Sequence, residues 1–272
     1  MSKRNSQTAK TAARERLRVE RERQAKKDKA KRQAIVAGSI VAVLAIAGVA
    51  SYLVMQGNKP SYWEAAKDDA LVAPKNTSGK NNTTVVLGKD SAKKTIIAYE
   101  DSRCPVCAAF EQAVGPTLKK DLDAGKYKIQ YVGATFLDTN LQGEGSKNAL
   151  SALGAALNVS KDAFWDYKEA MYSTKWHPEE TTDKFKDDSY LIKIANTVPA
   201  LKNDKTFQKD VKDGTFDKWA LEMSKGFDDN KYGVQGTPAF VLDGKKITGS
   251  DGDNAPNTAD GWNSAVDKAL KG

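Results

Sequence analysis

The sequence predicts an α/β domain with a large helical insertion, preceded by a single transmembrane helix. Three observations lead to this prediction. Residues 34–55 form one uncharged apolar run. Strand and helix patterns alternate from residue 83 onward, and within that part the stretch 140–232 is mainly helical. The chain also has only two cysteines, Cys104 and Cys107, which stand together at the start of one predicted helix.

The net charge of +8 belongs to the N-terminal tail. Residues 1–33 carry 13 of the 43 Lys and Arg residues and 4 of the 35 Asp and Glu residues, so the rest of the chain, with 30 basic and 31 acidic residues, is nearly neutral. A domain that binds nucleic acid should carry a basic face of its own, so nucleic acid is not expected as a partner. The composition of the tail is typical of a solvated helix or a disordered segment, with attraction to anionic lipid as the functional alternative.

Residues 34–55 are predicted to be a membrane anchor. As a helix this uncharged run would be about 33 Å long, close to the ~30 Å thickness of the hydrocarbon layer. A cleavable signal peptide is the main alternative, but its apolar region is usually ~7–15 residues long and its charged prefix is short. A buried core helix would not explain the basic block beside the run. Because the basic residues precede the span, the N-terminus is expected in the cytoplasm and the domain outside.

The composition of residues 56–82, rich in Lys, Asn, Gly, Ser and Pro, predicts a linker. The folded domain is expected over 83–272. Its first predicted strands are 84–87 and 95–99, and the second is a continuous apolar run, typical of a central strand covered on both faces. The next strand is predicted at 127–136.

A helix is predicted to begin at the cysteine pair, where Pro105 suits the first turn. Its buried stripe recurs every four residues: Val106, Phe110, Val114 and Leu118. The step Gly115–Pro116 is expected to kink or interrupt this helix, because proline has no N–H and crowds the preceding turn.

Amphipathic stripes predict helices within the insertion over 149–157 and 163–171, the second capped by Ser160. Further helical pieces are expected near 190–200 and 216–223. The C-terminal part is predicted to form a hairpin from strands 239–242 and 246–248, turning at Asp243–Gly244, and then a helix over 259–270.

The spacing of Cys104 and Cys107 predicts redox chemistry. At a helix start the first sulfur meets unpaired N–H groups and the positive end of the helix dipole, which favour the thiolate that attacks disulfides. A structural zinc site needs about four ligands, and His177, the only histidine, is expected in a loop. A purely structural disulfide would gain little from closing so short a loop. No metal and no cofactor are therefore expected.

Two segments resemble the thioredoxin-fold family, and within it the DsbA-like extracytoplasmic thiol–disulfide oxidoreductases. They are residues 99–111, with the motif Cys-Pro-Val-Cys, and residues 233–240, with Gly-Thr-Pro. The helical stretch between them occupies the place of the insertion that marks the DsbA-like group. The resemblance covers about 83–272 and implies a thioredoxin fold, a mixed central sheet flanked by helices.

The resemblance also implies roles for single residues. Cys104 would be the solvent-facing nucleophile and Cys107 the more buried resolving thiol. Pro238 would be a cis-proline that presents the Thr237 backbone to an extended peptide. Glu111 lies one helical turn after Cys107 and could accept its proton, although an ordinary exposed helix glutamate is the alternative.

Three residues near Cys104 bear on the pKa of its thiol. Arg103 could lower the pKa of the Cys104 thiol, but both Arg103 and Asp101 could simply be solvated. The best-known strong oxidants of the group carry histidine between their cysteines, where this chain has Val106. We therefore expect a smaller depression of the Cys104 pKa and a less oxidising pair.

The function expected is disulfide formation in exported proteins by a membrane-anchored enzyme of a bacterial envelope, with unfolded cysteine-containing polypeptides as substrates. The resemblance implies a membrane partner for reoxidation, of the DsbB or vitamin K epoxide reductase type. Two alternatives are a membrane-tethered reductase and a peptide-binding or chaperone module without turnover. The chain is expected to be a monomer, and its tryptophans Trp165, Trp176 and Trp219 are expected to belong to the core.

Overall fold

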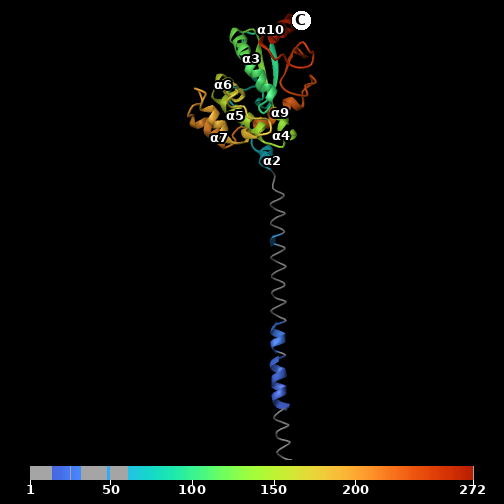
Figure 1. Cartoon of the computed structure of the whole chain (residues 1–272). Coiled ribbons are helices and arrows are strands. Elements are labelled where there is room, and N and C mark those ends of the chain that lie inside the picture. The colour runs from blue at the N-terminus through green and yellow to red at the C-terminus, as the bar shows by residue number, and fades with distance from the viewer. Residues whose placement is uncertain (1–13, 25, 32–47, 50–60, 272) are drawn as a thin grey trace, which may run out of the picture. The chain divides into compact units, whose positions relative to one another are not determined.

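A computed structural model of the chain describes residues 14–24, 26–31, 48–49 and 61–271, in two units divided after Pro60 (Figure 1). In the first unit the described tail residues are helical. The predicted anchor at 34–55 lies outside the described residues except for 48–49. Among the described residues, no helix has the length and apolar character needed to cross a bilayer.

The second unit is built on a mixed five-stranded sheet in the order β1-β3-β2-β4-β5. Only β2 and β3 run parallel, and the other neighbours are antiparallel. The strands are β1 (Val85–Leu87), β2 (Thr95–Asp101), β3 (Lys128–Ala134), β4 (Ala239–Leu242) and β5 (Lys245–Lys246). The expected hairpin is present, with Asp243 and Gly244 at φ of 50° and 81°, the left-handed region that such tight turns require.

The register of the sheet brings the two sequence motifs together. Tyr99 in β2 pairs with Ala239 in antiparallel β4, so the end of β2 lies beside the start of β4. The chain continues from β2 to Cys104, and Pro238 immediately precedes β4. Residues 134 positions apart in the sequence therefore meet at one edge of the sheet.

The helix α3 (Pro105–Ala124) follows the cysteine loop and buries Phe110, Val114 and Leu118 of its predicted stripe. Val106, the first residue of that stripe, is exposed, because it lies in the first turn beside the cysteine loop. The expected interruption at Gly115–Pro116 is wrong, because α3 continues through Pro116. Proline removes one helical hydrogen bond, and the burial of Val114 and Leu118, at 0% and 1% exposed, holds the following turns in place. The helix ends at Gly125, which adopts a left-handed φ of 75°.

The insertion contains six helices. They are α4 (Phe136–Asn140), α5 (Gly145–Val159), α6 (Lys161–Tyr172), α7 (Asp188–Ala195), α8 (Lys205–Lys212) and α9 (Asp217–Asp228), with a 3₁₀ turn at Lys184–Lys186. These are two more (α4 and α8) than the sequence pattern indicates. Ser160 caps α6 as predicted, since its hydroxyl accepts the Ala163 N–H at 2.9 Å. The unpredicted α8 is capped by Asp204 and buries only Phe207 and Val211. The chain closes with α10 (Ala259–Lys271).

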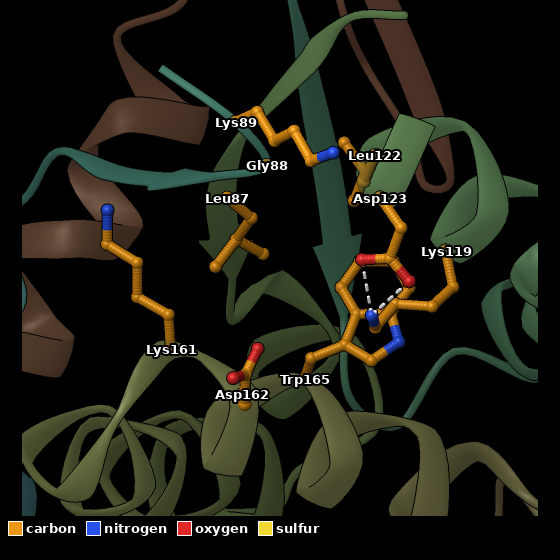
Figure 2. Close-up of a pocket in the computed structure, with 9 residues that line it drawn as sticks. All are labelled: Leu87, Gly88, Lys89, Lys119, Leu122, Asp123, Lys161, Asp162 and Trp165. Carbon is orange, nitrogen blue, oxygen red and sulfur yellow. Dashed lines mark hydrogen bonds and ion pairs between the residues drawn. The ribbon is translucent and has the colours of Figure 1, made fainter. Parts of the chain in front are cut away.

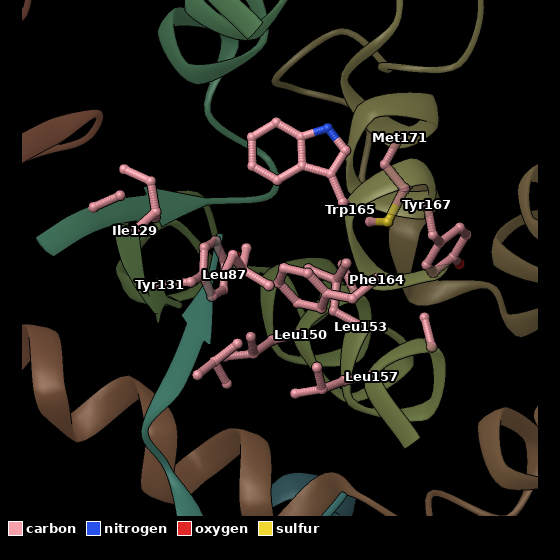
Figure 3. Close-up of a cluster of buried hydrophobic side chains, with 14 of the residues drawn as sticks. Leu87, Ile129, Tyr131, Leu150, Leu153, Leu157, Phe164, Trp165, Tyr167 and Met171 are labelled. Atoms are coloured by element: carbon pink, nitrogen blue, oxygen red, sulfur yellow. The ribbon is translucent and has the colours of Figure 1, made fainter. Parts of the chain in front are cut away.

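The insertion and the sheet share one core (Figure 3). Leu87, Ile129 and Tyr131 of the sheet face Phe164 of α6 and Leu150 of α5. Trp165 and Trp219 are buried and Trp176 packs against the same cluster, as expected of core tryptophans. The insertion is therefore part of the domain's hydrophobic core.

Part of the predicted linker also packs on the domain. Residues 61–82 contain α2 (Tyr62–Ala65) and two 3₁₀ turns, Ala66–Asp68 and Lys80–Asn82. Trp63 is only 5% exposed, and the Tyr62 hydroxyl donates to Asp217 of α9 at 2.6 Å. Burial of this aromatic side chain explains why the folded unit begins near Ser61.

Candidate active site

Cys104 is the N-cap of α3. Its own N–H donates to the Asp101 carbonyl at 2.9 Å, which turns the chain from β2 into the helix. Its sulfur accepts the Cys107 N–H at 3.4 Å, in the position that a serine or aspartate oxygen occupies at other helix starts. The expected placement of the first sulfur at the helix start is thus present.

The two sulfurs differ in exposure. Both cysteines are free thiols in the structure; Cys104 is 6% exposed and Cys107 is fully buried. The order of burial agrees with the roles expected from the sequence, but Cys104 keeps only a small opening to solvent. A partner that attacks Cys104 must therefore come close to the surface beside the cysteine loop.

Thr237 and Pro238 complete the surroundings of Cys104. The Thr237–Pro238 peptide bond is cis, as the resemblance implies. The Cys104 thiol donates to the Thr237 carbonyl across 3.3 Å. The prolyl loop and the cysteine loop are therefore in direct contact.

The environment lowers the pKa of Cys104 to about 6. The largest cause is hydrogen bonding from Cys107, which outweighs the opposing effect of burial, and Thr237 and the backbone N–H groups of Cys107 and Val106 add to it. Burial, the neighbouring Cys104 and Glu100 raise the pKa of Cys107 well above its usual value. At neutral pH the pair consequently holds one thiolate, on Cys104, and one thiol, on Cys107.

A groove of about 550 Å³ opens beside the cysteine loop. Val106 stands at its edge with 61% of its surface exposed. The groove is lined by Val106, Ala109, Phe110, Thr237, Pro238, Gly249, Ser250, Asp251, Asn254, Ala255, Pro256 and Asn257. It joins the helix start, the cis-proline and the loop between β5 and α10.

Glu111 is buried, so the interpretation as an exposed helix glutamate is wrong. It is 3% exposed and accepts the Lys168 ammonium of α6 at 2.6 Å. The same ammonium donates to both oxygens of Glu100, at 3.3 and 3.2 Å, and Glu100 is also buried. We call Glu100, Lys168 and Glu111 the charge cluster.

The charge cluster holds two carboxylates and one ammonium away from water. Burial, the largest cause, raises the pKa of Glu100 to about 8, although Lys168 opposes it and Glu111 adds to it. Burial, the largest single effect, lowers the pKa of Lys168, but Glu100 and Glu111 together outweigh it and raise the pKa, so Lys168 stays charged. Two ionised carboxylates would leave a net negative charge in a low-dielectric site, and the raised pKa of Glu100 means that Glu100 holds a proton near neutral pH.

A family model described as thioredoxin matches residues 80–268, which is more than half of the chain. The chain belongs to the thioredoxin family. The model spans the cysteine motif, the helical insertion and the Gly-Thr-Pro motif, so the family covers the whole candidate site.

Relatives of this thioredoxin-family chain are named for disulfide formation. It is 28% identical over 190 residues to disulfide bond formation protein D of Bacillus subtilis, covering 69% of this chain and 77% of that protein. It is 25% identical over 233 residues to a probable disulfide bond formation protein D of Bacillus cereus, covering 85% and 93%. These names confirm the resemblance found in the sequence.

Solved structures of DsbA-type proteins share the fold. Oxidised DsbA of Mycobacterium tuberculosis superposes with a TM-score of 0.52 at 23% identity, over 68% of this chain and 99% of that one. Oxidised BdbD of Bacillus subtilis gives 0.53 at 24% identity, over 74% and 99%. Both confirm the expected thioredoxin fold with its helical insertion.

Asp101 and Arg103 are not solvated in this family member. Arg103 is 3% exposed, and its guanidinium pairs with Asp138 at 3.0 Å and Asp183 at 3.3 Å. The Asp101 carboxylate accepts the Ser146 hydroxyl at 2.6 Å and two backbone N–H groups. These contacts fix the cysteine loop to the insertion and direct the guanidinium toward carboxylates, so a role in lowering the Cys104 pKa has no support.

His177 lies in a loop, as expected, but it is half-buried beneath the active site. Its Nε2 is 3.1 Å from the Ser102 carbonyl, and its ring stacks on Tyr172 at a centroid distance of 5.8 Å. Burial lowers its pKa, so it is neutral near pH 7. Its contacts support the cysteine loop from below.

A separate pocket of about 330 Å³ lies by the last turns of α3 (Figure 2). It contains the ion pair between Lys119 and Asp123, and Trp165 forms one wall. Neither cysteine lines this pocket, and its charged side chains are on the surface. It therefore has no part in the cysteine chemistry.

Sequence reasoning missed Glu100 and Lys168, although one signal was available. Lys168 follows Phe164 by four residues and precedes Tyr172 by four, so it occupies the buried stripe of α6. A lysine at a core position indicates a buried partner. Which carboxylates it meets depends on how α6 packs against α3 and β2.

Proposed function

We propose that this chain is an extracytoplasmic thiol–disulfide oxidoreductase that forms disulfides in exported proteins through Cys104 and Cys107. One observation carries the proposal. The pKa of Cys104 is lowered to about 6, its thiol contacts the cis-proline loop, and its neighbours Val106 and Thr237 line a groove. A thiolate that is stable at neutral pH is a good leaving group, which favours the oxidising direction.

The reaction starts from the Cys104–Cys107 disulfide. A substrate thiolate attacks the Cys104 sulfur, a bond forms between these two sulfurs, and the electron pair of the broken bond leaves on Cys107. A second substrate thiolate then attacks the substrate sulfur bound to Cys104. The substrate disulfide forms, and the electron pair leaves on Cys104, so two electrons pass from substrate to enzyme.

The charge cluster donates a proton to Cys107 and accepts it back in this proposal. Cys107 leaves as a thiolate inside the protein, where burial strongly favours the neutral thiol. Glu111 lies one turn further along α3 and shares the Lys168 ammonium with Glu100, which holds a proton near neutral pH. The cluster gives this proton to Cys107 and takes it back when the pair is reoxidised.

The groove binds an extended segment of substrate. Its edge offers the backbone of Thr237 next to the reactive sulfur, and its floor is formed by small or apolar side chains such as Ala109 and Pro238. Backbone contacts with few charged side chains suit unfolded polypeptides of many sequences.

Residues 34–55 anchor the enzyme in the membrane with residues 1–33 in the cytoplasm, and the sequence pattern supports this topology. Two electrons per cycle must leave the reduced pair, so a membrane redox partner of the DsbB or vitamin K epoxide reductase type reoxidises it.

Equilibration with glutathione buffers tests the direction of electron flow. The full-length chain in detergent micelles is equilibrated, quenched with acid and analysed by mass spectrometry. A reduction potential toward about −120 mV supports the oxidant, and one near about −270 mV makes the enzyme a reductase. Cys104→Ser and Cys107→Ser chains should both fail to reoxidise a reduced, unfolded substrate protein, and retained activity in either would contradict the proposal.

A further inference from the structure

Asp251 is the one charged side chain that lines the groove beside the cysteine loop, among residues 61–271. On the α3 side the groove is lined by apolar residues, such as Val106 and Ala109, and part of its lining comes from the loop between β5 and α10. We call residues 249–257 of this loop the groove loop. The Asp251 side chain is exposed, so its carboxylate is available to a bound molecule.

Hydrogen bonds hold this carboxylate in one orientation. Its Oδ1 accepts the backbone N–H groups of Asp253 at 3.1 Å and Asn254 at 3.2 Å, and its Oδ2 accepts the Asn254 side-chain amide at 2.9 Å. A carboxylate has about four acceptor positions, so one remains free on Oδ2. The Asn254 amide, with these backbone N–H groups, lowers the pKa of Asp251, and the carboxylate is charged at neutral pH.

The backbone of the groove loop is closed on itself. The Gly249 N–H donates to the Asn254 carbonyl at 2.7 Å, and the Gly252 N–H donates to the Gly249 carbonyl at 3.1 Å. Gly252 has a φ of 81°, a conformation that favours glycine. Pro256 is buried and ties the loop to the domain. A ligand that pairs with Asp251 therefore does not have to order the carboxylate first, which lowers the entropic cost of binding.

Thr237 connects the groove to the reactive sulfur. It lines the groove, and its carbonyl accepts the Cys104 thiol at 3.3 Å. An extended peptide advances about 3.3 Å per residue, so the residues that flank its cysteine lie beside the groove when that cysteine has reached Cys104. In complexes of this kind the main chain gives affinity and the side chains give selectivity.

We propose that Asp251 makes the groove selective for substrate segments that carry Lys or Arg close to the reacting cysteine. This inference rests on the disulfide exchange proposed above and names a substrate class for it. A fixed carboxylate attracts a cationic flank and repels Asp or Glu at the same place. No Lys, Arg or His of the described residues lines the groove, so no lining residue offsets the charge of Asp251.

Exchange with three synthetic peptides tests this selectivity. The peptides are identical except at the residues that flank each of their two cysteines, which are Lys, Gln or Glu. The oxidised full-length chain in uncharged detergent micelles is mixed with each reduced peptide at low ionic strength, and reduction of the Cys104–Cys107 disulfide is followed by acid quench and mass spectrometry. Each rate is divided by the rate of the same peptide with hydroxyethyl disulfide, an uncharged reagent, because a neighbouring lysine also favours the thiolate of the free peptide.

We expect the corrected rates to fall in the order Lys, Gln, Glu, with the Lys peptide about threefold faster than the Gln peptide, as suits an exposed ion pair. Asp251→Asn keeps an oxygen for the N–H groups of the loop and removes the charge, so the ratio of these two rates should approach one. The same ratio in the wild type and in Asp251→Asn would overturn the proposal.

Asp253→Asn is the matched control. Asp253 is an exposed carboxylate of the same loop, two residues from Asp251, and it does not line the groove. We expect this variant to keep the wild-type ratio. An equal loss of the ratio in both variants would assign the effect to the overall charge of the loop and overturn the role of Asp251.

Salt gives a second measurement that needs no variant. In 1 M NaCl the Debye length is about 3 Å, so the preference for the Lys peptide should disappear. A preference that persists would come from shape or hydrogen bonding and would overturn selection by charge. A wild type that oxidises none of the peptides defeats the proposed function as well, whereas equal oxidation of all three defeats the selectivity alone.

Discussion

The two sides of α3 serve the same cysteines with opposite chemistry. The groove side presents Val106, Ala109 and Pro238, and Asp251 is the only charged residue along it. The other side carries Glu111, Lys168 and Glu100, none more than 3% exposed. The groove side is open to solvent, and the side chains of the charge cluster are buried.

This difference separates two transfers that disulfide exchange must combine. Electron pairs move between sulfurs at the helix start, where Cys104 needs contact with a large and variable partner. In the proposed reaction protons move at Cys107, where burial keeps the thiol neutral and raises the pKa of the nearby Glu100. One helix can supply both environments because residues four apart face the same way and residues two apart do not.

The largest effect is expected on the cluster side, where removal of the Lys168 ammonium should lower the stability of the fold. Lys168→Met leaves two buried carboxylates without a counter-ion, and we expect a loss of about 3–5 kcal/mol in the free energy of unfolding. Denaturant titration measures it, with Lys161→Met, an exposed residue of the same helix, as the control. A loss below about 1 kcal/mol would show that the cluster is neutralised in another way.

On the groove side, the lowered pKa of Cys104 should make the stability of the reduced chain depend on pH. Cys104 has a pKa of about 6 in the folded chain and an ordinary value of 9.0, so its thiolate stabilises the reduced fold above pH 6, and this stabilisation is lost as pH falls through 6. Between pH 5 and pH 7 the reduced chain should gain about 1.4 kcal/mol relative to the oxidised chain. Because Glu100 titrates in both forms, the difference between two denaturation series isolates Cys104, and parallel series would contradict the assignment.

Charge on the groove side should tune the pair further. Val106→His places a cation beside the thiolate, and we expect the Cys104 pKa to fall by about one unit and the reduction potential to rise by about 30 mV. Thiolate absorbance and glutathione equilibria measure the two changes. Val106→Gln, polar but uncharged, should leave both close to the wild type, and an equal shift in the two variants would exclude a charge effect.

The groove side could be predicted from the sequence and the cluster side could not. Cys104, Cys107, Thr237 and Pro238 lie in short motifs whose spacing defines the local backbone, and a strand pair brings them together. Glu111 meets Lys168 only because α6 packs against α3, a contact between segments 57 positions apart. Local patterns contain no information about such packing, which is also why Glu111 was open to two interpretations and Arg103 was thought free to influence the thiol.

Pro116 shows a different limit. Propensity argues for a break at this residue, and an isolated helix of this sequence would be weakened there. The surrounding core overrides that local preference, since Val114 and Leu118 are buried on either side. Local sequence preference therefore cannot decide whether a helix continues through a proline when both neighbouring turns are packed in the core.

The position of Lys168 on α6 has a practical consequence for engineering. The counter-ion of two core carboxylates comes from the segment that distinguishes this enzyme from a minimal five-stranded scaffold. A shortened variant without the helical insertion would leave Glu100 and Glu111 facing each other without a counter-ion. The part of the domain that carries the cysteines therefore cannot be used as a smaller enzyme unless both glutamates are replaced.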